Sequence, residues 1–229
     1  MKLVSFQSMD AFKQLIEKGY LEADERYIDM NKMGPTYDWV VEKMNETIPN
    51  EHGVRFPLWC WVKFKRGICP PKHKGEPVQG FDVKITFEKA REDVFITDFR
   101  KYSFLLNNVY IPDNKQDKER FEEELKKSGI TAEELLAIVR RDKDIDIRSD
   151  NAFRDICEKI RNSFNKCITE DSDVLQGCVW RINLDEVTKI EILQDSDYRY
   201  GSFNYLRKNG KRFDWIKDYY DMLDRENQL

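Results

Sequence analysis

The sequence predicts an α+β protein, in which a mixed sheet is flanked by helices and carries a helical insertion. Strand-like and helix-like segments follow one another without the regular strand–helix–strand rhythm of a parallel sheet. Residues 113–165 differ from the rest because they are rich in charge and contain no proline. With 229 residues, 40% of them hydrophobic and 36% charged, the chain is long enough to bury a core, and we expect one domain over residues 1–229.

The chain is expected to open with a strand at residues 2–6, followed by a helix that begins near Ser8 or Asp10 and ends at Gly19. A second helix is predicted after Pro35 and Thr36. Its apolar residues recur at helical offsets, which gives one buried stripe made of Tyr37, Val40, Val41, Met44 and Ile48.

Residues 55–64 place two tryptophans on one predicted strand. Because side chains alternate across a sheet, Trp59, Trp61 and Lys63 share one face, and Leu58 and Cys60 lie on the other. Two interpretations are open. The strand is central with both faces covered, or the two indoles form a stacking wall for a base or a nicotinamide-like ring.

A loop at residues 65–80, rich in proline and glycine, separates this strand from two further strands predicted at 81–87 and 94–97. Asp98 is expected to begin a helical turn. Three helices are then predicted within residues 113–165, and Thr131 with Glu134 forms a capping box at the start of the second.

The chain is expected to return to β structure at residues 178–184 and 189–193. A further helix is predicted after them. Its apolar stripe must dock on another part of the protein, and it consists of Phe213, Ile216, Tyr220 and Leu223.

Composition and motifs exclude several classes of protein. The net charge of −4 and the pI near 5.5 argue against a surface that binds nucleic acid over its whole extent. No apolar stretch approaches the roughly 20 residues of a spanning helix, and we expect a cytoplasmic protein without a membrane partner. The five cysteines form no CxxC pair, and we predict no metal site. A Gly-x-Ser-x-Gly elbow and a glycine-rich phosphate loop are both missing from the sequence.

Two segments combine positive charge with flat side chains, as expected where phosphates and bases are held together. Residues 63–74 carry lysines, an arginine and a histidine without an acid. Residues 198–212 interleave four aromatic residues with five basic ones, again without an acid. Solvated loops and aromatic residues that cover the sheet would produce the same pattern, so both interpretations stay open.

Five short motifs carry a resemblance to a known family. The chain resembles the bacterial family catalogued as domain of unknown function 3841, and the resemblance covers most of its length. The Pro-x-Trp-x-Trp strand is the most specific element. The motifs are Phe6-Gln7-Ser8, Tyr37-Asp38-Trp39, Pro57-Leu58-Trp59-Cys60-Trp61, Val94-Phe95-Ile96-Thr97-Asp98-Phe99 and Gln176-Gly-Cys-Val-Trp180. This family name implies a single compact domain and no established activity.

In residue order and type the chain also resembles the ADP-ribosyltransferase superfamily, whose members open with a strand that ends in a polar residue and Ser or Thr, directly before a helix. Gln7 and Ser8 stand at that position. The resemblance implies that they bind the ribose of NAD, and that an aromatic side chain flanks the nicotinamide. Tyr37, Trp59 or Trp61 is the matching residue.

The same resemblance implies a catalytic residue on a late strand, where this chain has Gln176. In that superfamily a glutamate usually stabilises the oxocarbenium-like centre that forms as nicotinamide leaves. A glutamine cannot carry negative charge, so the activity implied is weak, altered or absent. A structural interpretation of the same residues stays open and is the favoured one, in which Gln7 pairs with a neighbouring backbone, Ser8 caps the first helix and Gln176 starts a strand.

Two functions are therefore predicted. The first is recognition of a nucleotide, with NAD as the expected cofactor, in a cleft between the first strand, the tryptophan strand and the strand at Gln176. The alternative is a non-catalytic module that holds nucleic acid or a protein through residues 63–74 and 198–212. The sequence carries no signal of an oligomeric state.

Overall fold

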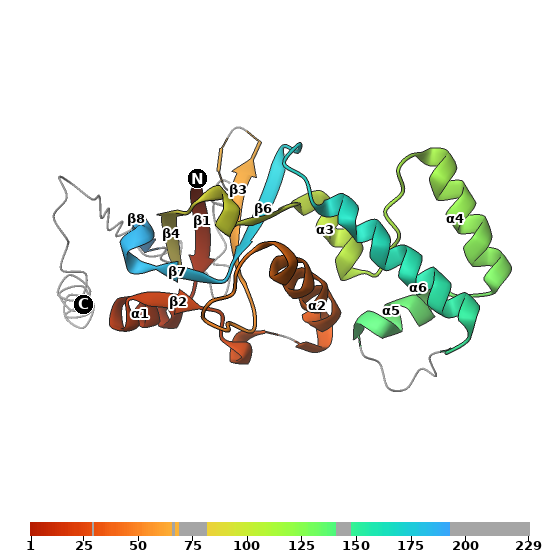
Figure 1. The fold of residues 1–229 in the computed structure, drawn as a ribbon, viewed down its shortest axis with the longest axis horizontal. Helices are drawn as coiled ribbons and strands as arrows, with labels where there is room; N and C mark the ends of the chain where they lie inside the picture. Colours follow the sequence, from red (N-terminus) through yellow and green to blue (C-terminus); the bar gives the residue numbers. More distant parts are fainter. Residues whose placement is uncertain (29, 66, 69–81, 141–147, 193–229) are drawn as a thin grey trace, which may run out of the picture. The chain divides into compact units, whose positions relative to one another are not determined.

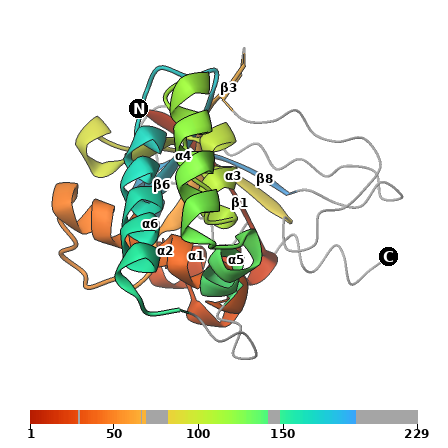
Figure 2. The same ribbon diagram turned by 90° about the vertical axis from the view of Figure 1, so that its right-hand side faces the viewer.

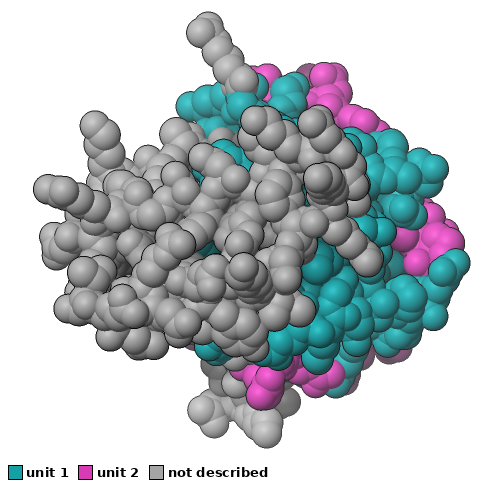
Figure 3. Space-filling view, turned by 90° about the vertical axis from the view of Figure 1, so that its left-hand side faces the viewer, with its two compact units in different colours: residues 1–23, 50–94, 177–229 teal, residues 24–49, 95–176 magenta. Residues whose placement is uncertain are grey.

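The computed structural model describes residues 1–28, 30–65, 67–68, 82–140 and 148–192. The chain divides into two compact units (Figure 3). The first unit comprises residues 1–23, 50–94 and 177–229, and the second comprises residues 24–49 and 95–176. The predicted C-terminal helix, residues 198–212 and most of the predicted loop at 65–80 lie outside the described residues.

The α+β class is confirmed (Figure 1). Six strands form one sheet in the order β5-β6-β3-β1-β4-β8, and β2 pairs with β7 in a second sheet. The strands are β1 Lys2–Gln7, β2 Tyr20–Glu22, β3 Leu58–Phe64, β4 Val83–Glu88, β5 Phe95–Asp98, β6 Val174–Val179, β7 Arg181–Asn183 and β8 Val187–Ile192.

The six-strand sheet is antiparallel, where a mixed sheet was expected. The pairs β1–β3, β1–β4 and β4–β8 all run antiparallel. The connection from β1 to β3 contains helices and is long enough to return the chain in either direction, so the spacing of the strands could not decide between the two arrangements.

Helices in the described residues begin and end largely at the caps that the sequence predicts. Ser8 accepts a hydrogen bond from the amide of Ala11, and Gly19 ends the first helix in the left-handed conformation, with φ 77°. Thr131 and Glu134 form the predicted capping box. The helices are α1 Met9–Lys18, α2 Met30–Thr47, α3 Phe99–Leu106, α4 Lys115–Ser128, α5 Ala132–Arg140 and α6 Asn151–Ser163.

Strand register in the first unit separates two faces of the sheet. Val4 lies opposite Trp61 of β3 and opposite Thr86 of β4, so these three side chains share one face, called the outer face here. Most side chains on the other face, the inner face, are almost completely buried, which places the core there. They include Leu3, Ser5, Cys60, Val83, Ile85, Phe87 and Ile190.

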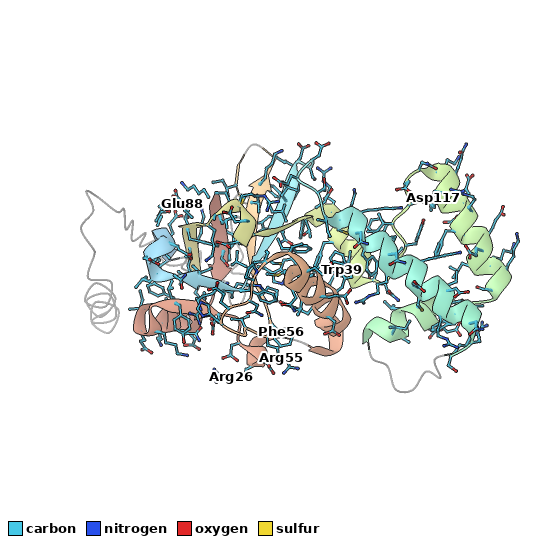
Figure 4. The ribbon with its side chains drawn as sticks, viewed as in Figure 1. Arg26, Trp39, Arg55, Phe56, Glu88 and Asp117 are labelled. Atoms are coloured by element: carbon cyan, nitrogen blue, oxygen red, sulfur yellow. The ribbon has the colours of Figure 1, made fainter. Side chains whose placement is uncertain are left out.

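In the second unit, Trp39 of α2 forms the centre of the core (Figure 4). Its side chain is 1% exposed. The ring meets Phe95 edge-on at 6.1 Å between centroids and Phe164 at 6.2 Å, the perpendicular arrangement that aromatic quadrupoles favour. The tryptophan of the Tyr37-Asp38-Trp39 motif therefore has a packing role.

The three helices predicted between residues 113 and 165 are α4, α5 and α6, and all belong to the second unit. Helix α4 lies beside α6 in both ribbon views (Figures 1 and 2), and Lys159 of α6 pairs with Glu124 of α4. A polar cluster fixes the start of α4. There Asp117 accepts hydrogen bonds from the amide of Asp113 at 2.9 Å and from the hydroxyl of Tyr110 at 3.0 Å.

Lowering the pH is expected to destabilise the start of α4. The hydrogen bond from the Asp113 amide, with a smaller contribution from Tyr110, holds the pKa of Asp117 below its ordinary value. A depressed folded-state pKa stabilises the fold fully above the ordinary carboxyl pKa, and this stabilisation is lost as pH falls through the folded-state value. Asp117→Asn should therefore destabilise the protein at neutral pH, and its deficit should shrink in acid. Denaturant unfolding across pH measures this, with the exposed Glu119→Gln as control. A deficit that is constant with pH would contradict the assignment.

Three side chains lie so close to Gly177 that a larger residue does not fit there. A methyl group there would lie 2.8 Å from Val94 Cγ1, 3.0 Å from Val62 Cγ2 and 3.1 Å from Cys60 Sγ. Because such overpacking forces buried groups to shift, Gly177→Ala should lower the free energy of unfolding by about 1–3 kcal/mol.

The matched control is Gly19→Ala, where the methyl group meets nothing within 4 Å but the backbone has φ 77°. Its cost is one of conformation, about 1–2 kcal/mol, and Gly19→Asn should recover part of it. The outcome that counts against the packing argument is a Gly177→Ala protein with wild-type stability.

Candidate functional site

A buried hydroxyl joins β1 to β3 in the first unit. Ser5 is 0% exposed, and its Oγ donates a hydrogen bond to the carbonyl oxygen of Trp59 at 2.8 Å. The same Oγ accepts from Nε2 of Gln7 at 2.7 Å. A buried hydroxyl is stabilised only when such partners exist. The amide nitrogen of Gln7 is therefore directed along its own strand toward Ser5.

The junction between β1 and α1 is held by Asp82. Its carboxylate accepts a hydrogen bond from the amide of Met9 at 3.0 Å, and its amide donates to the carbonyl of Gln7 at 2.9 Å. Ser8 lies between these contacts, half-buried, with its hydroxyl engaged as the cap of α1 at 3.2 Å from the Ala11 amide. In this arrangement Gln7 and Ser8 both serve to fix the end of the strand.

Trp59 and Trp61 lie on the outer face of β3, which is an interior strand of the six-strand sheet. Both indoles are half-buried. The ring of Trp61 is perpendicular to that of Phe64, with 5.7 Å between centroids. Alternation along β1 places Phe6 on the same face, and it is half-buried too. Phe6, Trp59 and Trp61 are called the aromatic patch below.

Basic side chains lie on the same face, on β4 and β8. Lys84 and Lys189 both pair with Glu191, at 3.2 Å and 3.0 Å between nitrogen and oxygen. Burial opposes ionisation of Glu191, but the hydrogen bonds from Lys189 and Lys84 outweigh it and lower the pKa of this carboxyl. The outer face therefore has an aromatic half on β1 and β3 and a charged half on β4 and β8, where Lys84 and Lys189 stand against Glu88 and Glu191.

The predicted site residues of the first unit do not share one face. Gln7 follows Leu3 and Ser5 at a spacing of two, which puts it on the inner face, whereas Trp59 and Trp61 lie on the outer face. Strand alternation and the register of Val4 with Trp61 fix this separation. A ligand that stacks on the indoles would therefore lie across the sheet from the side chain of Gln7.

The other two predicted residues belong to the second unit. Tyr37 lies on the buried stripe of α2 and is 8% exposed. Gln176 lies in β6 and is half-buried, and its side-chain amide makes no hydrogen bond with a described residue. Because Gly177 faces Cys60 and Val62, alternation directs Gln176 to the opposite face of β6.

The cysteines in the described part of the chain are thiols. Burial raises the pKa of Cys60 to about 12, although the Gly177 amide acts against the shift, and burial also raises the pKa of Cys167 to about 12. At neutral pH such groups are protonated and poor nucleophiles. The residues described contain no cluster of three or more His, Cys, Asp or Glu side chains suited to a metal ion. None of their helices has the length and apolar character needed to span a membrane.

Of the two basic and aromatic segments, only Lys63–Lys65 and residues 67–68 are described. Lys63 and Lys65 are exposed. Phe64 and Gly67 exchange backbone hydrogen bonds of 2.8 and 2.9 Å, which closes a tight turn, and Lys65 has the positive φ of 52° that such turns require. The remaining residues of 63–74 and all of 198–212 lie outside the described part.

Comparison with known families gives one match. The family model described as a domain of unknown function (DUF3841) covers residues 2–188. The chain belongs to this family. Searches of the curated proteins and of the solved structures found no match. The part that matches the DUF3841 model includes every predicted site residue and ends before residues 198–212.

Ser5, Asp82 and Phe6 were missed as parts of the site by sequence reasoning. One signal was present for Ser5, because it is the polar residue within the otherwise apolar run from Leu3 to Phe6. Its partners lie far away in the chain, since the acceptor on Trp59 is 54 positions distant. The sequence shows that a polar residue lies among apolar ones, and it does not show which groups form hydrogen bonds with it.

Loss of the Ser5 hydroxyl should destabilise the sheet. Ser5→Ala removes the hydroxyl that donates to the Trp59 carbonyl and accepts from the side-chain amide of Gln7, at an expected cost of about 1–3 kcal/mol. Gln7→Ala, at a half-buried position, should cost less. Because the two residues share a hydrogen bond, the double variant should lose less stability than the sum of the single ones. Strictly additive losses in chemical denaturation would contradict the network.

Proposed function

We propose that this DUF3841 protein binds a nucleotide on the outer face of its six-strand sheet, with NAD as the leading ligand. The observation that carries the proposal is the aromatic patch. Phe6, Trp59 and Trp61 come from neighbouring strands, share one face and are each half-buried. Flat heterocycles stack on such side chains, and each stacked base contributes about 1–3 kcal/mol.

Charge on the same face supports a ligand with phosphate groups. Lys63 follows Trp61 by two positions on β3, about 7 Å along the strand. In a nucleotide, the phosphate attached through the ribose lies at a comparable distance from the stacked base. The further lysines, Lys84 and Lys189, share the carboxylate of Glu191.

The proposed function is binding of NAD, and it does not include cleavage of NAD. Gln176 cannot supply the negative charge that stabilises an oxocarbenium-like centre. Gln7 and Ser8 already make the hydrogen bonds that hold β1 and α1. Their contribution is therefore to position the strand that carries Phe6, and Tyr37 contributes to the buried stripe of its helix.

A second candidate is a module that binds single-stranded nucleic acid. The observation in its favour is that aromatic residues stand on two adjacent strands of an antiparallel sheet, with exposed Lys63 and Lys65 at the end of β3. Sheets with this arrangement hold unpaired bases in several RNA-binding folds. The two candidates use the same face and differ in how salt acts on binding.

Thermal-shift titrations with NAD, ADP-ribose, ATP, short RNA and short DNA test the proposal, because a ligand that binds only the folded state raises Tm. We expect NAD or ADP-ribose to stabilise the protein, and Trp61→Ala to weaken binding by roughly 5- to 150-fold, the equivalent of one stacked base. Trp59→Ala should act similarly.

Phe99→Ala is the matched control, since Phe99 is an aromatic residue of the second unit with 39% exposure. Its binding should equal that of the wild type. Stabilisation by oligonucleotides alone, lost steeply as salt rises, would favour the second candidate. If no ligand raises Tm, or if Trp61→Ala binds like the wild type, nucleotide binding on this face is wrong.

A further inference from the structure

The net positive charge of the outer face lies beside the aromatic patch. On β4 and β8 two lysines and two glutamates balance one another on this face. Strands β1 and β3 contain two charged residues, Lys2 and Lys63, and neither strand contains a carboxylate. Alternation from Val4 and Trp61 puts both lysines on the outer face. The excess charge is therefore carried by the same two strands that carry the aromatic side chains.

The two lysines lie at the same end of this face. Because β1 and β3 run antiparallel with Val4 opposite Trp61, two residues back along β1 is Lys2, and two residues forward along β3 is Lys63. Both side chains are exposed, and neighbouring strands lie about 5 Å apart. Like charges at facing positions repel one another and destabilise a sheet. An anion bound between two ammonium groups relieves this repulsion, and each lysine offers it three N–H donors.

The lysine pair follows the aromatic patch along the strands. Lys63 lies about 7 Å beyond Trp61 on β3, and Lys2 lies about 7 Å from Val4 on β1. A nucleotide whose base stacks on Trp61 therefore brings its phosphates to this pair when it extends along the strands. Lysine binds phosphate as a compact point charge, so two ammonium groups side by side match two linked phosphates.

We infer that Lys2 and Lys63 bind a pyrophosphate group, with one ammonium for each phosphate. The outer face then selects nucleoside diphosphates and their esters, such as ADP-ribose and NAD, over nucleoside monophosphates. This assignment rests on the proposed function, because the stacked base directs the phosphates to the lysines. Glu88 of β4 lies opposite Lys2 (Figure 4), and its carboxylate repels the same phosphates.

Calorimetric titration of the full chain with ADP-ribose and with AMP tests the assignment. The two ligands share adenosine and have a similar total charge, and ADP-ribose has the second phosphate. We expect the wild type to bind ADP-ribose about 5-fold more tightly than AMP, the equivalent of one further ion pair at the surface. Lys2→Gln and Lys63→Gln should each bring the ratio of the two dissociation constants to about 1, because one ammonium then remains for the two phosphates.

Lys18→Gln is the matched control, since it removes the same charge from an exposed position on α1. It should leave the ratio at its wild-type value. Glu88→Gln should tighten binding of ADP-ribose by about 2- to 5-fold, because it removes a repulsive charge. Equal affinities in the wild type, or lysine variants that weaken both ligands by the same factor, would overturn the pyrophosphate assignment and retain nucleotide binding.

Inorganic pyrophosphate, which has no base, separates the assignment from the proposed function. If neither AMP nor ADP-ribose binds, the proposed function is wrong. A rise of Tm with pyrophosphate that Lys2→Gln/Lys63→Gln abolishes and Lys18→Gln retains would then keep the lysine pair as a diphosphate site. No rise of Tm with pyrophosphate in that case would overturn the lysine site too.

Discussion

The register of β1 determines the chemistry of the first unit. With Val4 opposite Trp61 and Thr86, every side chain of β1, β3 and β4 is assigned to one of two faces. A shift of β3 by one residue would turn the indoles into the core. The same shift of β1 or of β4 would expose Leu3 or Ile85, which are completely buried. The register is therefore enforced by burial of the inner face, and the polarity of the outer face follows from it.

Ser5 is the exception within this pattern, because it is polar, fully buried and on the inner face. Its hydroxyl bonds the backbone of Trp59, so it joins the strand that carries Phe6 to the strand that carries both indoles. A buried network of this kind fixes geometry when all its members have partners. The distance between Phe6 and the two indoles determines whether a ring can stack on them. This distance thus depends on Ser5, which lies on the opposite face.

Much of the fold could be predicted because the sequence signals of a helix are local. The stripe of α2 and the caps at Ser8 and Thr131 involve residues within a few positions of one another. Prediction was less accurate where the signal was ambiguous or short. Helix α2 begins at Met30 rather than after Pro35, since proline was taken to mark its first turn. Strands of three residues were missed or merged, as at β2 and at the break between β6 and β7 around Trp180.

The candidate site was predictable only in part, because a site is made of long-range contacts. The placement of Trp59 and Trp61 together followed from strand alternation and is observed. The placement of Gln7 with them did not follow, because it depends on which residue of β3 lies opposite β1. The most direct measurement is photo-cross-linking with an azido-adenine analogue of NAD, followed by mapping of the adduct. The account predicts adducts within Leu58–Phe64, suppressed by excess NAD. Adducts confined to other peptides would contradict it.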